Sequence, residues 1–517
     1  MPGRSSCALS GALSAAAATS PGGRRWALTG AAAGALLFGA SLLPADAGAF
    51  CGFFVSGADA ALSNNASQVV LLRKGSRTVM SMSNNYKGPP QDFAMVVPVP
   101  VVLQKEQVKT LAPEVFKRID QLSAPRLVEY WEQDPCYVPP PASPRRLYKS
   151  APAMVASEGA AAAPADYGVK IEAKFEVGEY QILILSAQES GGLERWLRLS
   201  KYNIPKGAAA ALGPYIRDQM KFFVAKVDIK KVHKDSHGLV VLSPLRFSFD
   251  ASELRLPVRL GLLNADGKQD LLVYVLHPDK RFEVANYRNL FIPTNLEVSN
   301  EVRKNFPGFY AELFDETLRR NNDSGVVTEY SWQTTSCDPC PTPPLEASDL
   351  YTLGDDSFAG AAPSADSPSG GAPQPYYGSP PSYVLTRLHT RYDQKTLSED
   401  LLFREAPPVV GGRANGEGGL GDQGAQVEKN GVNNFQGRYI IRHYWEGKVA
   451  CRSPRYGVWG GPPGSGYNPG GSGPIEPAQD LANAPRGKVS LPALVTSGLP
   501  SFGIPPQKRA LRPGEKR

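Results

Sequence analysis

Histidine is scarce in this chain, with five residues among 517. A Ser–His–Asp triad or a histidine-based metal centre therefore has little material, because both depend on imidazole groups. The signatures G-x-S-x-G and H-E-x-x-H, the P-loop, and a G-x-G-x-x-G within a βαβ unit are also absent. The sequence thus predicts no catalytic, cofactor-binding or metal-binding residue.

Clustered basic charge is lacking in the part of the chain expected to fold. The formal net charge is +7, but residues 1–47 carry a net +2 and residues 486–517 a net +6, which leaves the remainder near neutral. Nucleic-acid binding needs Lys and Arg gathered on ordered structure, so we predict no nucleic-acid partner. The basic tail could contact an anionic envelope surface, and an inert, solvated tail is the simpler interpretation.

Long apolar runs are limited to one, from Ala27 to Leu43. Arg24 and Arg25 precede it, and the small-residue pattern at 45–47 or 47–49 follows it. This order is typical of a secretory signal peptide, and the paired arginines leave the twin-arginine route open. We predict export to the periplasm, the cell surface or the medium, with no transmembrane segment after cleavage.

Cysteine is also infrequent, and Cys7 lies within the expected signal peptide. An exported chain meets an oxidising compartment, so the remaining cysteines are expected in disulfides. Those five residues are Cys51, Cys136, Cys337, Cys340 and Cys451. They allow two bridges and leave one thiol, and we expect Cys51–Cys136 and a bridge from Cys337 or Cys340 to Cys451.

Strand patterns dominate the mature chain, and helix patterns are grouped between them. Hydrophobic periodicity predicts strands at 69–72, 78–82, 93–102, 170–176, 180–186, 222–227, 245–249, 256–263, 271–276, 326–332 and 438–445. It predicts helices at 108–122, 127–131, 193–199, 208–220 and 309–319. Strands that arrive in runs favour an α+β fold with mostly antiparallel sheet.

Stretches rich in Pro, Gly, Ala and Ser divide the chain, because they cannot bury enough apolar surface to offset the entropy of ordering. The expected parts are the signal peptide 1–47, an N-terminal α+β segment 48–138, a Pro/Ala-rich linker 139–166, a main α+β segment 167–337, a low-complexity linker 338–382, a structured piece 383–451 with a Gly-rich insert 406–434, and a disordered basic tail 452–517.

Several motifs resemble the DUF2330 family of uncharacterised, exported bacterial proteins. The N-terminal motifs are at 50–55, 65–70, 92–100, 123–130 and 134–136, and later ones are at 192–197, 388–392 and 435–439. The resemblance spans roughly residues 48–451. It implies an exported protein, and it attaches no activity or catalytic residue to any position.

Cys337-Asp338-Pro339-Cys340 forms a C-x-x-C pattern. In redox enzymes this pattern sits at a helix N-terminus, which lowers the pKa of the first thiol. Here Pro341, Pro343 and Pro344 follow, so no helix is expected to start there. A structural disulfide, within the motif or to Cys451, is the favoured interpretation.

Two further groups have ordinary interpretations. His233 and His237 have the spacing of a metal pair on a helix, but their flanks predict strand, turn, strand. Glu132 and Asp134 beside Trp131 have the composition of an acid pair, and solvated carboxylates are the simpler interpretation. Core packing is likewise the default, against a ligand groove, for the aromatic residues Tyr130, Trp131, Trp196, Tyr202, Phe222 and Phe223.

The sequence therefore favours a non-enzymatic envelope or extracellular protein with a binding or structural role. One alternative is an exported hydrolase-like enzyme whose site is assembled from scattered residues. A second alternative is a thiol-redox protein that uses Cys337 and Cys340. No cofactor is predicted, and the partner is unknown, an envelope component being one possibility.

Overall fold

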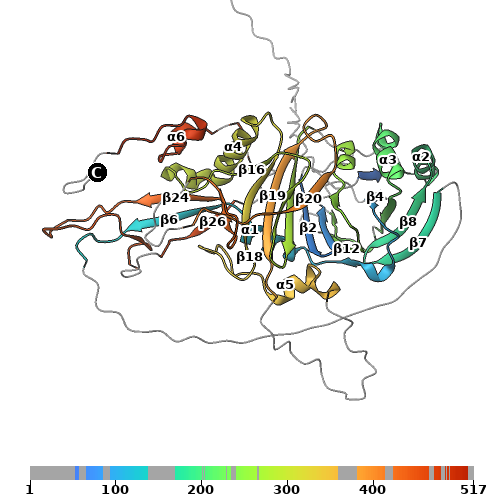
Figure 1. Cartoon of the computed structure of the whole chain (residues 1–517), viewed down its shortest axis with the longest axis horizontal. Coiled ribbons are helices and arrows are strands. Elements are labelled where there is room, and N and C mark those ends of the chain that lie inside the picture. The colour runs from blue at the N-terminus through green and yellow to red at the C-terminus, as the bar shows by residue number, and fades with distance from the viewer. Residues whose placement is uncertain are drawn as a thin grey trace, which may run out of the picture. The chain divides into compact units, whose positions relative to one another are not determined.

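The computed structural model describes residues 53–56, 66–84, 93–137, 169–358 and 381–509, with internal gaps at 201, 203, 229, 235–239, 265–266, 414–422, 465–470, 479–483, 485 and 488. These residues form an α+β fold with antiparallel and mixed sheets (Figure 1). The α+β class predicted from the sequence is confirmed. The signal peptide, Cys51, the linker 139–166 and residues 359–380 lie outside the described residues.

The largest sheet has the strand order β22-β21-β23-β18-β19-β14-β2-β3-β12-β5, with β16 also paired to β18. Its strands are β2 (Ala66–Lys74), β3 (Arg77–Asn84), β5 (Val108–Thr110), β12 (Leu245–Asp250), β14 (Gln269–His277), β16 (Asn289–Phe291), β18 (Val326–Gln333), β19 (Val384–Tyr392), β21 (Val409–Gly411), β22 (Gln426–Val427) and β23 (Asn434–Gln436). The predicted β2–β3 hairpin is confirmed, and Gly75 turns it with a φ of 58°.

A second, antiparallel sheet has the order β1-β4-β9-β8-β7. Its strands are β1 (Phe53–Ser56), β4 (Phe93–Val99), β7 (Val169–Val177), β8 (Tyr180–Ala187) and β9 (Lys221–Val227). One face shares an apolar cluster with the largest sheet, where the rings of Phe223 and Phe247 lie 4.6 Å apart. The predicted helices α2 (Ser190–Leu199) and α3 (Ala208–Arg217) cover the other face.

Two smaller sheets complete the fold. One has the order β17-β24-β6-β25, with β26 also paired to β6, and the other has the order β13-β20-β15. Their strands are β6 (Arg126–Glu132), β13 (Leu254–Leu256), β15 (Arg281–Val284), β17 (Leu296–Glu297), β20 (Leu401–Ala406), β24 (Arg438–His443), β25 (Trp459–Gly460) and β26 (Ile475–Pro477). A short hairpin pairs β10 (His233–Lys234) with β11 (Val240–Val241).

Helices cover the side of the largest sheet that faces away from the second sheet. The helices α1 (Glu114–Ser123) and α5 (Ala347–Thr352) pack there against an apolar cluster that includes Leu72, Tyr274 and Leu385. The helix α4 (Phe306–Arg319) packs on a neighbouring cluster with β18, β23 and β24. Within the described residues, no helix is both long and apolar enough to cross a membrane.

Three element predictions are wrong. Residues 127–131 form strand β6, not a helix, because β24 and β26 pair with a strand that is buried along most of its length. Its short apolar stretch is interrupted by Glu129 and carries no clear period. The helix expected from 108 begins at Glu114, after Pro113, and Val108–Thr110 are strand β5. The strand expected at 256–263 is mostly a 3-10 helix, η2 (Arg259–Asn264).

Ordered structure also reaches into segments expected to be disordered. The helix α5 lies inside the expected linker 338–382 and buries Leu350. After Cys451 the chain adds β25, β26 and the short helix α6 (Leu491–Leu494), and it buries Leu491, Val495 and Leu499 in the cluster around α4. Widely spaced apolar residues among prolines and glycines gave too weak a pattern to predict this packing. The tail prediction is therefore corrected for its described residues.

Candidate functional site

Charged side chains are concentrated beneath the helices of the largest sheet. Asp270 on β14, Glu329 on β18, and Arg387 and His389 on β19 are all buried, with exposed fractions of 5% or less. Charged residues are almost never fully buried unless they are paired. This cluster is therefore the main concentration of potentially reactive groups that we find in the described residues.

Strand alternation places the basic residues of β19 on one face. Arg387, His389 and Arg391 stand two residues apart, so their side chains share the face covered by helices. Leu388 and Tyr392 point to the other face, where they join the apolar cluster between the two large sheets. The motif at 388–392 therefore supplies both a core face and a charged face.

A β-bulge in β18 brings Glu329 into the cluster. The pairing of β18 with β19 shifts register between Thr328 and Tyr330, so Glu329 is an extra residue at this point. Bulges re-aim side chains and occur often near functional sites. The Glu329 carboxylate accepts hydrogen bonds from His389 Nδ1 at 2.7 Å, from Arg387 Nε at 2.6 Å, and from the hydroxyl of Tyr310 on α4.

His389 lies between two carboxylates. Its Nδ1 contacts Glu329, and its Nε2 lies 3.0 Å from Asp270 Oδ1. Its ring stacks on Phe314 of α4, with ring centroids 3.9 Å apart. Burial lowers the pKa of His389, but the two carboxylates outweigh burial and raise it. Because an ionised carboxylate only accepts hydrogen bonds, this placement favours the imidazolium form of His389, in which both ring nitrogens donate.

Arg387 connects this cluster to α1. Its Nη1 lies 2.6 Å from Asp120 Oδ1, which also accepts a hydrogen bond from the Tyr274 hydroxyl at 2.7 Å. Burial alone would raise the pKa of Glu329, but His389 and Arg387 lower it to about 2. The carboxylate is therefore ionised at neutral pH.

The cluster extends outward from Asp270 toward α4 and the C-terminal segment. Arg486 lies 3.2 Å from Asp270 Oδ1 and 2.5 Å from Asp315 Oδ1. Arg391 approaches the same two carboxylates more loosely, at 4.0 and 3.8 Å. We call the whole set the charge network: the carboxylates Asp120, Asp270, Asp315 and Glu329, and the cations Arg387, His389, Arg391 and Arg486. It is balanced when His389 is protonated.

The inner part of the charge network is buried, and its groups are hydrogen-bonded to one another. A general acid or base must come within hydrogen-bonding distance of the reacting group, but His389 is 1% exposed and both its nitrogens contact carboxylates. Its groups hold α1, α4 and the sheet together, and removal of one partner would leave a buried charge uncompensated.

A pocket opens at the outer end of the charge network. It has a volume of about 200 Å³ and is lined by Lys268, Asp315, Leu318, Arg319, Asp323 and Arg391. Sites for drug-sized ligands usually have roughly 300–1,000 Å³, so this pocket suits a small molecule. Asp315 and Arg391 belong to both the pocket and the charge network.

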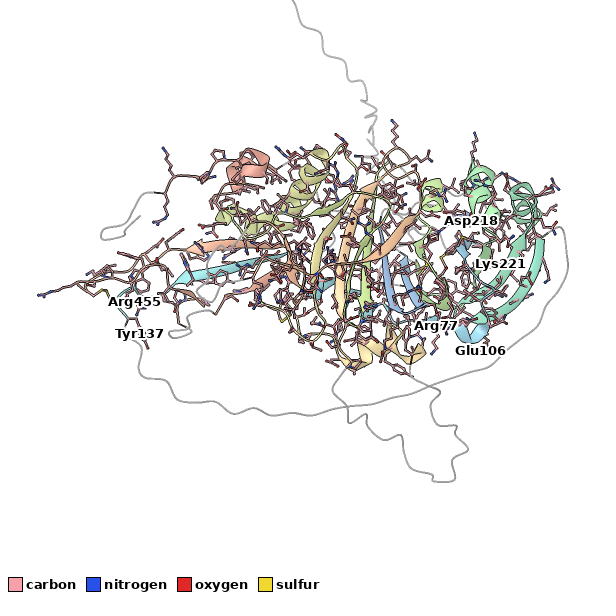
Figure 2. All side chains as sticks on the ribbon, viewed as in Figure 1. Arg77, Glu106, Tyr137, Asp218, Lys221 and Arg455 are labelled. Atoms are coloured by element: carbon pink, nitrogen blue, oxygen red, sulfur yellow. A yellow bond between two sulfur atoms is a disulfide. The ribbon has the colours of Figure 1, made fainter. Side chains whose placement is uncertain are left out.

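One disulfide lies within the C-x-x-C motif, which is one of the two outcomes that the sequence left open there, whereas the expected bridges Cys51–Cys136 and Cys337 or Cys340 to Cys451 are wrong. Cys337 bonds Cys340, and Cys136 bonds Cys451 across 315 residues of sequence. The longer bridge joins the segments that follow the neighbouring parallel strands β6 and β24, a proximity that the sequence could not reveal. At the same end, Arg455 donates its backbone N–H to Pro135, and it lies close to Tyr137 (Figure 2).

The C-x-x-C loop lies between β18 and α5. The backbone carbonyl of Pro339 accepts a hydrogen bond from Arg126 Nη1 at 2.8 Å, and the carbonyl of Asp338 accepts one from Gln436. The helix α5 begins only at Ala347, so Cys337 does not stand at a helix N-terminus as the thiol of a redox enzyme does. These features agree with a structural disulfide.

The other candidates from the sequence have structural surroundings. Glu132 is buried and accepts backbone N–H groups of Trp445 and Gly457, at 3.0 and 2.7 Å. Asp134 accepts the N–H of Cys136 at 2.8 Å, so the two carboxylates serve separate loops. His233 starts the β10 hairpin, and His237 lies outside the described residues.

The aromatic candidates are mostly core residues. Trp196 lies on the buried face of α2 in the same cluster as Phe222, Phe223 lies between the large sheets, and Tyr130 packs beside β24. Trp131 stacks on His443. Among the described residues, no group of three or more His, Cys, Asp and Glu side chains is placed to hold a metal ion.

Sequence reasoning did not single out Asp120, Asp270, Glu329, Arg387 or His389 as site residues. One signal was available, because Arg387, His389 and Arg391 repeat every second residue in a strand that is otherwise apolar or hydroxylic. Their acidic partners come from four other elements, α1, β14, β18 and α4, and the bulge that admits Glu329 has no sequence signature. The pairing therefore became visible only in the fold.

The fold and the charge network define an α+β protein with two disulfides and a buried, charge-balanced centre. Residues 44–404 match the family described as "Uncharacterized protein conserved in bacteria (DUF2330)", and the chain belongs to this family. The matched residues include the charge network except Arg486, and they end before β24. No curated protein and no solved structure matches the chain.

Proposed function

We propose that this protein is exported and acts as a non-enzymatic binding or structural protein of the cell envelope or the extracellular space. The observation that carries the proposal is the closure of the charge network. His389 is hydrogen-bonded to Glu329 and Asp270. Glu329 also accepts hydrogen bonds from Arg387 and Tyr310. Such a centre stabilises the fold and leaves recognition to the surface.

Support for export comes from the cysteines and the leader. The bridge between Cys136 and Cys451 fixes the sheet that contains β6 and β24, and disulfides of this kind persist in oxidising compartments. Residues 24–47 have the order of a cleavable signal. Both features are consistent with an envelope or secreted protein.

The test of export is expression of the full chain in a bacterium, followed by fractionation and mass spectrometry. We expect a mature product that begins after residue 47 or 49, found outside the cytoplasm, with Cys136 joined to Cys451 and Cys337 to Cys340. A full-length cytosolic product with free thiols would overturn the proposal.

The thiol-redox role is a second candidate, because Cys337 and Cys340 do form a C-x-x-C disulfide. A redox protein must cycle this bond with a partner dithiol, whereas a structural bond resists mild reductants. We expect both disulfides of the folded protein to survive millimolar glutathione. Selective and reversible opening of Cys337–Cys340 under those conditions would favour the redox role instead.

A further inference from the structure

The pocket at the outer end of the charge network is built by three chain segments. Lys268 precedes β14, Arg391 lies near the end of β19, and Asp315, Leu318 and Arg319 lie toward the C-terminal end of α4. Asp323 follows in the turn after the helix. Since one water occupies about 30 Å³ of liquid, a volume of about 200 Å³ corresponds to a molecule of only a few heavy atoms.

Arg391 differs from Arg387, four residues earlier on the same face of β19. Arg387 is fully buried and makes short contacts of 2.6 Å with both Glu329 and Asp120. Arg391 is 3.8 and 4.0 Å from its carboxylates, distances too long for hydrogen bonds. Among the residues that the structure describes, none accepts a hydrogen bond from its Nη1.

The other charged residues of the pocket have close partners. Asp315 contacts Arg486 at 2.5 Å, Lys268 contacts Asp323 at 3.0 Å, and Arg319 pairs with Glu312 and Glu316. Arg391 is thus the lining residue with the loosest contacts to its carboxylates. Its Nη1 atom is buried, whereas the side chain as a whole is 22% exposed. A guanidinium has five donors in a fork that matches a carboxylate.

We propose that this pocket binds a small molecule through a carboxylate group, with the Arg391 fork and Lys268 as the anion-binding residues. The inference rests on the proposed binding role and names its ligand chemistry. Asp315 and Asp323 in the wall limit the ligand to a single negative charge, because a phosphate dianion would meet stronger repulsion. Leu318 offers one apolar contact for a short carbon chain.

The experiment uses the mature protein with both disulfides intact, titrated at low ionic strength with acetate, glycine, inorganic phosphate and methylammonium, and followed by two-dimensional NMR. We expect saturable shifts with acetate or glycine for residues around 268, 318 and 391, and weaker binding of phosphate and methylammonium. A lost charge-assisted hydrogen bond weakens binding by about tenfold or more, so Arg391→Lys and Lys268→Gln should each reduce carboxylate affinity about tenfold.

The matched control is Lys304→Gln, because Lys304 is 74% exposed and forms an ion pair with Glu301 on the surface. This variant should bind acetate and glycine as the wild type does, and thermal unfolding of all three variants verifies that each is folded. Absence of saturable carboxylate binding, tighter binding of phosphate, or equal affinity in Lys268→Gln and the wild type would each overturn the inference. An exported protein that binds no carboxylate would leave the proposed localisation standing, whereas a cytosolic protein that binds one would overturn only the localisation.

Discussion

Glu329 shows how one extra residue in a strand can place a negative charge in the core. The bulge in β18 lets this carboxylate receive three hydrogen bonds, two from β19 and one from α4. Burying a charge is costly unless the charge is paired and hydrogen-bonded, and Arg387 and His389 supply both. The centre of the molecule therefore depends on the fit of a few atoms.

Glu329→Gln is expected to destabilise the protein by about 3–5 kcal/mol, because the change leaves the charges of Arg387 and His389 without their shared partner. Urea unfolding followed by circular dichroism measures the effect. Glu301→Gln is the control, since Glu301 is 65% exposed and pairs with Lys304 on the surface, and it should leave stability nearly unchanged. A loss in Glu329→Gln no larger than in the control would contradict the role assigned to the network.

The stability contributed by His389 should depend on pH in one direction. Its pKa is raised above the ordinary value of 6.5, by Glu329 and Asp270 against the effect of burial. The contribution is therefore fully present below pH 6.5 and is lost as pH rises through the folded-state pKa. The stability difference between the wild type and His389→Gln should shrink on the alkaline side, and a difference independent of pH would argue against an imidazolium.

The contribution of Glu329 to stability should depend on pH in the opposite direction. Its pKa is lowered from 4.5 to about 2, because His389 and Arg387 outweigh the effect of burial. Its contribution is present above pH 4.5 and is lost as pH falls toward about 2. Chemical unfolding of the wild type and Glu329→Gln at several pH values should show the two converging below pH 4.5. A constant gap from pH 5 to pH 2 would contradict the lowered pKa.

Among the elements, hairpins were the most predictable and isolated strands the least. The β2–β3 and β7–β8 hairpins carry strand-like sequence on both sides of a glycine turn, and local sequence is enough to define them. The strand β6 pairs with β24, more than 300 residues away. Its sequence from Arg126 to Glu132 mixes apolar and charged residues in a way that fits a short helix as well as a strand. Long-range pairing decides such cases, and it leaves no local pattern.

The charge network, like the isolated strands, could be predicted only in part from the sequence. The spacing of Arg387, His389 and Arg391 marks a charged face on a strand, but nothing in the sequence pairs it with Asp120 or Asp270. These partners come from α1 and β14, which the topology brings beside β19. A site built across elements is therefore visible only in part before the fold is known.

The disulfides stabilise different elements and should differ in strength. The Cys136–Cys451 bridge closes a loop of more than 300 residues, whereas Cys337–Cys340 closes a very short one, and loop closure contributes more for long loops. Replacement of Cys136 and Cys451 by Ser should cost about 2–5 kcal/mol and increase hydrogen exchange in β6 and β24. The same change at Cys337 and Cys340 should cost less, and the reverse order would contradict this account.

For the whole molecule, the segment after Cys451 is part of the core. Leu499 is 2% exposed within the cluster around α4, and Leu499→Ala should destabilise the protein by about 2–5 kcal/mol. Leu199 is 65% exposed, so Leu199→Ala is the matched control and should change little. Thermal unfolding of both variants gives the comparison. Equal, small effects would mean that this segment packs too weakly to matter.

Arg486 gives the C-terminal segment a second role, because it supplies a positive charge to Asp270 and Asp315 from outside the part of the chain that defines the family. A homologue that ends soon after the family region would lack the cation that Arg486 supplies to these two acidic residues. We expect such homologues to carry an uncharged residue where this chain has Asp270 or Asp315, or to donate a cation from another loop. Across the family, acidic residues at both of these positions should therefore be found mainly in chains that also have the C-terminal segment.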